Sequence, residues 1–102
     1  MRRAARVDAN LSEIVAVARK AGLRVYIRND ALADLDVQYG GLHEIWEVKR
    51  PSKTPEKLLT PRQVELRAQG WCIRLVTCAD DVLRAAKTLR RDLEAINRAR
   101  VA

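Results

Sequence analysis

Gly40 and Gly41 separate two segments that both read as β-strands. A two-residue hairpin turn requires positive φ angles, which glycine adopts without strain. A turn at these glycines places Asp34 directly opposite Glu47, and opposed residues share a face of the sheet, with Cβ atoms about 4.5–5.5 Å apart. A four-residue loop centred on the same glycines keeps this register, whereas a three-residue loop breaks it.

Four charged side chains meet on one face of the predicted hairpin. Side chains alternate between the faces of a strand, so Lys49 and Asp36 project to the same side as Asp34 and Glu47. Carboxylates this close repel each other unless positive charge compensates them. A lysine does so in part, and Mg²⁺ or Mn²⁺ does so more fully because these cations prefer hard oxygen ligands. The grouping favours metal-assisted hydrolysis of a phosphodiester.

The alternative is a solvated strand surface, where Asp, Glu and Lys commonly form cross-strand ion pairs. A lone D…E-x-K pattern more often has that meaning, because it is short and its residues are common. Ile45, Trp46 and Val48 surround the glutamate here. An acid within such an apolar strand is not typical of an exposed edge, so the context favours a functional site.

The chain reads as a single domain, 1–102, with the element order α-β-β-β-α-β-α. The hairpin strands pair antiparallel, and the last strand follows a helical crossover, which suits parallel pairing beside the third strand. The predicted fold class is α/β, a small mixed β-sheet flanked by helices. The expected segments are a basic N-terminal arm (1–9), a helix (10–21), a strand (23–28), the hairpin (34–49), a basic loop (50–59), a helix from Pro61, a strand (71–77) and a final helix (79–98).

Periodicity gives the final helix an apolar stripe, and its turns beyond about residue 90 exceed what a small sheet can cover. The stripe consists of Val82, Leu83, Ala86, Leu89, Leu93 and Ile96.

Two helix starts have the pattern of a capping box, in which a cap residue is followed three positions later by Glu or Gln. Asn10 precedes Glu13 in this way, and Thr60 precedes Gln63. Capping alone would explain both of the later residues.

The formal net charge of +7 favours a polyanionic partner, most simply DNA, although such charge also serves solubility. Arg50, Lys53 and Lys57 lie in the loop that follows Lys49, and Arg62 lies at the start of the next helix. We expect these four residues to bind substrate phosphates. The alternative for the loop residues is an ordinary solvated loop.

The sequence predicts a cytoplasmic protein with no membrane partner. No apolar run is long enough to span a bilayer, and the basic N-terminus lacks the hydrophobic region of a signal peptide. Cys72 and Cys78 would lie about 20 Å apart on one extended strand, too far for a bridge, and free thiols suit a reducing compartment. The chain is small for an autonomous enzyme, so we expect a homodimer or higher homo-oligomer.

The order of these residues resembles the PD-(D/E)XK nuclease superfamily. It is most similar to the small stand-alone VRR-NUC type and to the related Holliday-junction-resolvase-like proteins often found in phages. The resemblance covers most of the chain, from about Asn10 to Ala86. Asp34 matches the aspartate of "PD", Glu47 and Lys49 match E-x-K, Glu13 matches a glutamate of the first helix, and Leu59 to Gln63 matches the L(T/S)xxQ motif.

Three positions depart from the family pattern. Ala33 replaces the proline before the aspartate, and Ala31 replaces an upstream glycine. Asp36 stands where an apolar residue is usual, so it competes with Asp34 for the role of metal ligand. We favour Asp34, because it aligns with the motif and faces Glu47.

The resemblance implies a restriction-endonuclease-like core and a deoxyribonuclease that depends on Mg²⁺ or Mn²⁺. Asp34, Glu47 and the Val48 carbonyl would hold the metal. Lys49 would position or activate the attacking water.

The resemblance also implies that Glu13 and Gln63 support the site, in addition to any role as caps. A homodimer would present two sites, which suits structure-selective cleavage of branched DNA such as a four-way junction in recombination or repair. The alternatives are a non-catalytic nucleic-acid-binding or accessory module that retains the fold, and a domain that only binds protein partners.

Overall fold

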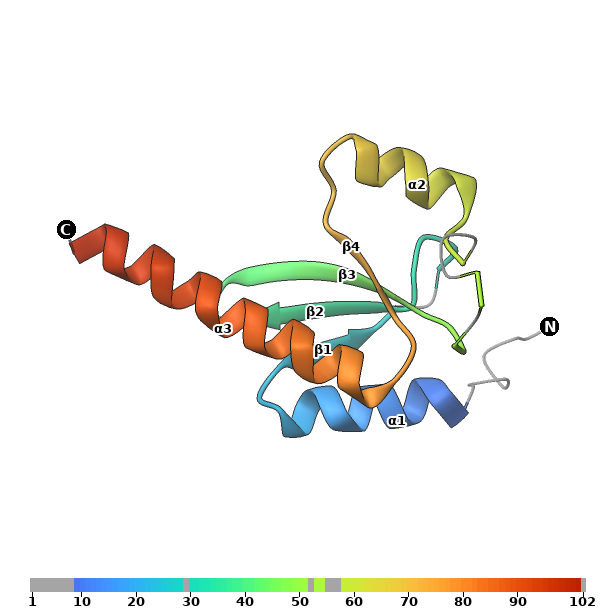
Figure 1. The fold of residues 1–102 in the computed structure, drawn as a ribbon, viewed down its shortest axis with the longest axis horizontal. Helices are drawn as coiled ribbons and strands as arrows, with labels where there is room; N and C mark the ends of the chain where they lie inside the picture. Colours follow the sequence, from blue (N-terminus) through green and yellow to red (C-terminus); the bar gives the residue numbers. More distant parts are fainter. Residues whose placement is uncertain (1–8, 29, 52, 55–57, 102) are drawn as a thin grey trace.

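The computed structural model describes residues 9–28, 30–51, 53–54 and 58–101. Lys57 and positions 1–8 of the predicted basic arm therefore lie outside the described residues. The elements follow the predicted order (Figure 1): α1 (Ala9–Lys20), β1 (Arg24–Ile27), β2 (Leu35–Tyr39), β3 (Leu42–Val48), α2 (Pro61–Ala68), β4 (Ile73–Val76) and α3 (Ala79–Val101).

The four strands form one mixed sheet in the order β1-β2-β3-β4. The first three strands pair antiparallel as a meander, and β4 pairs parallel to β3 after the crossover through α2. The predicted fold class is confirmed. No helix within the described part of the chain is long and apolar enough to cross a membrane.

The turn between β2 and β3 has the predicted register. Gly40 and Gly41 have φ angles of 56° and 94°, which a two-residue turn of this kind requires, and Leu35 pairs with Trp46. Gly40 is also restricted by packing, because a Cβ atom there would lie 2.4 Å from Leu93 Cδ2 of α3. The turn and α3 therefore fix each other's position.

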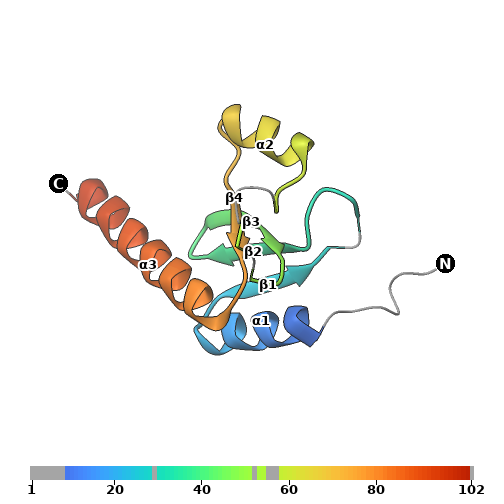
Figure 2. The ribbon, with the colours of Figure 1, turned by 45° about the vertical axis from the view of Figure 1, so that its right-hand side comes forward.

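One face of the sheet is covered by α1 and α3 (Figure 2). Trp46 is fully buried at the centre of this layer. The largest apolar cluster lies here and includes Ile14, Ala18, Leu35, Val37, Trp46, Val76, Val82, Ala85, Ala86 and Leu89.

The opposite face is covered by α2 and holds a smaller apolar cluster. Ala33, Ile45 and Ile73 are buried there, with Leu32, Leu59 and Leu66 packed around them. Because Leu35 and Trp46 face α1 and α3, alternation places their neighbours Asp34 and Glu47 on the α2 side.

The predicted N-cap role of Asn10 is wrong. Asn10 lies within α1, and its side-chain amide donates to the Lys49 carbonyl at 3.0 Å. This hydrogen bond joins two residues that are distant in sequence, so spacing along the chain could not show it. The first turn of α1 is thereby attached to the strand that carries the E-x-K residues.

The predicted stripe of α3 is confirmed for its first half. Val82, Ala86 and Leu89 are buried, whereas Leu83 is half exposed and is not part of the buried stripe. The helix continues to Val101, beyond the predicted end, and its C-terminal turns extend past the sheet (Figure 1).

We expect Leu89→Ala to lower the free energy of unfolding by about 2–5 kcal/mol, because it empties a site in the main apolar cluster. The matched change Ile96→Ala, on the overhanging part of α3, should cost about 0.5 kcal/mol or less. Urea denaturation followed by tryptophan fluorescence measures both. An equal loss for Ile96→Ala would show that the overhang is packed against another molecule.

Candidate active site

Asp34 lies immediately before β2 and is held by both neighbouring strands. Its N–H donates to the Trp46 carbonyl at 3.2 Å, and its own carbonyl accepts from the Arg28 N–H at 2.8 Å. Its Oδ2 accepts a hydrogen bond from the Val48 N–H at 2.8 Å. No described residue donates a hydrogen bond to its second carboxylate oxygen, Oδ1, so one oxygen of a well-fixed carboxylate remains free to bind a ligand.

Glu47 is 6 % exposed and has one partner for each carboxylate oxygen. Oε1 accepts from Gln63 Nε2 at 3.0 Å. Oε2 lies 3.1 Å from Lys49 Nζ, whose side chain is 41 % exposed. The lysine thus connects a buried acid to the solvent.

The pKa of Glu47 is raised above its usual value. Burial is the main cause, and the negative charge of Asp34 adds to it. The hydrogen bond from Gln63 and the ion pair with Lys49 act in the opposite direction without cancelling these effects. The positive charge near the two carboxylates is therefore too small to offset burial and the repulsion between them.

Glu44, three residues earlier on β3, is a buried glutamate with full compensation. It accepts two hydrogen bonds of 2.7 Å from Arg74 and one of 2.9 Å from Trp46 Nε1. Burial raises its pKa, but these donors outweigh burial, so the pKa is lowered overall. The sequence does not indicate this pair, because Arg74 lies on β4 and no local spacing connects it with Glu44.

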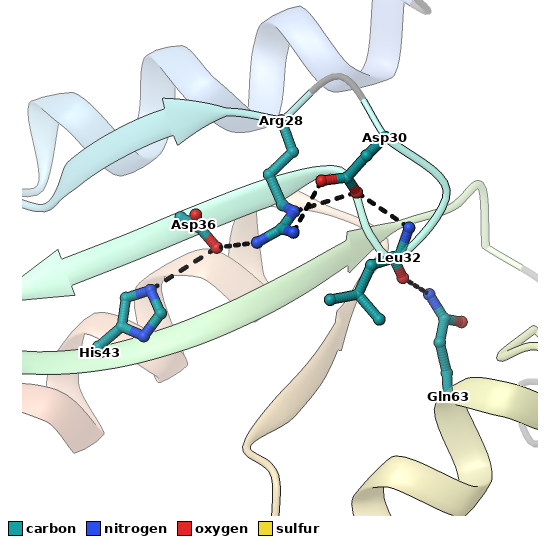
Figure 3. Close-up of polar contacts among 6 residues, drawn as sticks. All are labelled: Arg28, Asp30, Leu32, Asp36, His43 and Gln63. Carbon is teal, nitrogen blue, oxygen red and sulfur yellow. Dashed lines mark hydrogen bonds and ion pairs between the residues drawn. The ribbon is translucent and has the colours of Figure 1, made fainter.

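Gln63 is 2 % exposed and serves α2 and the site at once. Its Oε1 accepts from the Thr60 N–H at 2.9 Å, and its own N–H donates to Thr60 Oγ1 at 3.1 Å, which completes the predicted capping box. Its Nε2 donates to the Leu32 carbonyl at 2.6 Å (Figure 3). The same Nε2 donates to Glu47 Oε1. The capping role is confirmed, and the same amide contacts the acidic pair.

Asp36 belongs to a separate network on the same face (Figure 3). Its Oδ1 lies 2.8 Å from Arg28 Nη1 and 3.6 Å from His43 Nε2. Arg28 also pairs with Asp30 at 2.7 Å, and the hydrogen bonds that it donates to the two aspartates raise the Arg28 pKa. Asp34, and not Asp36, is therefore the aspartate beside Glu47.

This network also fixes the loop that leads to Asp34. Asp30 Oδ1 accepts from the Leu32 N–H at 2.9 Å, and the Leu32 carbonyl in turn accepts from Gln63. The sequence analysis did not assign a role to Arg28 or Asp30. The only available signal was that Asp30 stands in a predicted loop, where aspartate often binds a backbone N–H two residues on.

Within the described part of the chain, Glu13, Lys53 and Arg62 form no hydrogen bond or ion pair with Asp34 or Glu47. Glu13 is exposed, and no described residue forms a hydrogen bond or ion pair with it. It follows Asn10 by three positions and so lies on the side of α1 that faces Lys49. Arg50, Lys53 and Arg62 are all exposed.

Asp34 and Glu47 fit a small divalent cation by their donor chemistry, which consists of two hard carboxylate groups. Among the described residues, no three His, Cys, Asp or Glu side chains form a group that could hold a metal ion. Such a cation would need a backbone carbonyl, water and substrate oxygens besides the two acids. Mg²⁺ is commonly bound in this sparse way.

No protein-family model matches the chain, and neither does any curated protein or any solved structure. The resemblance to the PD-(D/E)XK superfamily therefore stays a prediction, and the interpretation of the site depends on its own geometry.

We expect Glu47→Gln to raise stability at pH 7 by about 0.5–2 kcal/mol, because it removes a buried negative charge beside Asp34. A raised pKa means that the folded protein holds this proton more tightly than the unfolded chain does. Stability is then lost as pH rises from the usual glutamate pKa through the folded value. The gain should disappear below about pH 4, where Glu47 is protonated in both states.

Glu44→Gln is the matched control, and we expect it to lower stability at pH 7. Its lowered pKa stabilises the folded protein at neutral pH, and that contribution is lost as pH falls. Thermal unfolding of both variants from pH 4 to 8 distinguishes the two glutamates. A loss of stability in both variants at pH 7 would contradict the assignment of Glu47 as the uncompensated acid.

Proposed function

We propose that this protein is a metal-dependent deoxyribonuclease, with Mg²⁺ or Mn²⁺ held by Asp34, Glu47 and the Val48 carbonyl. The observation that supports this most is the buried Glu47 beside Asp34 with too little positive charge around the pair. Glu44, on the same strand, has an arginine and an indole as partners. This contrast between the two buried glutamates supports binding of a cation by Asp34 and Glu47.

The side chains of the site each have a defined task in phosphodiester hydrolysis. When bound, the cation supplies positive charge to the scissile phosphate and favours deprotonation of water. Gln63 orients Glu47, and the Val48 N–H orients Asp34. Lys49 extends from Glu47 towards solvent, where its ammonium donates to the attacking water or to a phosphate oxygen as negative charge develops.

The surroundings of the site support DNA as the substrate. The net charge is +7, and Arg50 and Arg62 are exposed next to Lys49 and Gln63 in the chain. Backbone phosphates dominate the affinity of such contacts, so binding should weaken steeply as salt rises. The D…E-x-K order supports the same reaction class, and a homodimer acting on branched DNA is the assembly that we propose.

We expect cleavage of end-labelled DNA with Mg²⁺ or Mn²⁺ and none with EDTA. Single-stranded, duplex, flap and four-way-junction substrates should be compared. Asp34→Asn and Lys49→Ala should each lower the rate by about 10²-fold or more, because each removes a charge that acts on the reacting group. Asp36→Asn is the matched control and should retain most of the activity, since Asp36 pairs with Arg28.

The alternative function predicts a different result. A non-catalytic nucleic-acid-binding module would bind DNA in a salt-sensitive manner that survives Glu47→Ala, and it would cut no substrate with any metal. Ala33 stands where the resembled family has a proline, and it is buried in the cluster under α2. This departure from the family pattern supports the alternative. Tight binding without cleavage would establish it.

A further inference from the structure

A groove of about 300 Å³ lies where α2 leads into β4, away from the acidic pair. Its lining residues are Arg67, Trp71, Cys72, Ile73 and Arg74. Trp71 is 58 % exposed, whereas Trp46, the other of the two tryptophans in the chain, is fully buried. An indole this exposed presents a flat aromatic surface for a ligand to stack on.

One polar group of the groove is fixed by hydrogen bonds, and two others are available as donors. Arg74 is held by its two hydrogen bonds to Glu44, which makes this side of the groove rigid. The Arg67 guanidinium and the Trp71 indole N–H have no hydrogen-bond or ion-pair partner among the described residues. A guanidinium suits a phosphate, and an indole N–H suits a carbonyl or ring acceptor.

Trp71 is also held in place by its backbone. Its N–H donates to the Leu66 carbonyl at the end of α2, and its carbonyl accepts from the Ile73 N–H, both at 3.1 Å. The indole is therefore presented on a fixed backbone, so little backbone entropy is lost when a ligand stacks on it.

The groove and the acidic pair are connected by α2. Gln63, which contacts Glu47, and Arg67, which lines the groove, are four residues apart and lie on the same side of the helix, about 6 Å apart along its axis. A strand of DNA advances at least about 3.4 Å per nucleotide. A few nucleotides of one strand are therefore enough to reach both places.

We propose that this groove binds an unpaired nucleotide, with its base stacked on Trp71 and its phosphate on Arg67. The inference rests on the proposed function and specifies its substrate as DNA with a single-stranded segment next to the cleaved bond. A base inside a duplex has both of its faces covered by neighbours, so it cannot stack on the indole. Stacking on aromatic side chains is the usual means by which proteins bind single strands without sequence preference.

Tryptophan fluorescence of the full chain tests the groove without any cleavage. In EDTA, the protein is titrated with a short oligothymidylate, with an abasic strand of the same number of phosphates, and with a blunt duplex. Because Trp46 is fully buried, a change in emission reports Trp71. We expect the oligothymidylate to quench emission and the abasic strand and duplex to leave it nearly unchanged.

Substitutions then assign the contacts, with affinity measured by the anisotropy of labelled oligothymidylate. Trp71→Ala should weaken binding roughly tenfold, and Trp71→Phe should recover part of the loss. Arg67→Ala should also weaken binding, whereas Arg91→Ala, an exposed arginine on α3, is the matched control and should change affinity by less than about twofold.

Two results would overturn the inference. The first is equal quenching by the abasic strand, which would show attraction of phosphates alone. The second is a Trp71 emission that depends on protein concentration without DNA, which would show that a second copy covers the groove. Base-dependent quenching without cleavage supports the groove and contradicts the nuclease. Cleavage that is unchanged in Trp71→Ala supports the nuclease and contradicts the groove.

Discussion

The side-chain amide of Gln63 joins three parts of the molecule that are distant in sequence. It caps α2 at Thr60, holds the loop before β2 at Leu32, and fixes the carboxylate of Glu47. One buried, planar group with both an acceptor and two donor positions satisfies all of them. Any arrangement of α2 that broke one of these hydrogen bonds would leave a buried polar group without a partner. The position of α2 and the orientation of the acid are thus set together.

The two buried glutamates of β3 lie on opposite faces of the sheet and have different surroundings. Glu44 faces α1 and α3 and forms a charge pair with Arg74 that is complete within the protein. Glu47 faces α2 and meets Asp34, an amide and a solvent-exposed lysine. The two glutamates are three residues apart, and an odd separation along a strand puts side chains on opposite faces. The protein therefore compensates Glu44 fully with its own donors, whereas the pKa of Glu47 stays raised.

The parts that the sequence could predict are those determined by neighbouring residues. The turn at the paired glycines, the register of the hairpin and the capping box of Gln63 all follow from local backbone rules, and the structure has each of them. The contact of Asn10 with Lys49 and the pairing of Arg28 with Asp36 were not predictable in this way. Each depends on where strands and helices meet in space, which no spacing along the chain encodes.

The turn at Gly40 and Gly41 limits how this chain can change in length. Surface turns are usually the places where a protein accepts an inserted residue. An insertion here would move β3 by one position relative to β2 and turn its side chains to the opposite face. Glu47 would then enter the apolar layer under α1 and α3, and Trp46 would take its place beside α2. In related chains we expect length variation in the turns of α3 that extend past the sheet, and a constant length of the turn at Gly40 and Gly41.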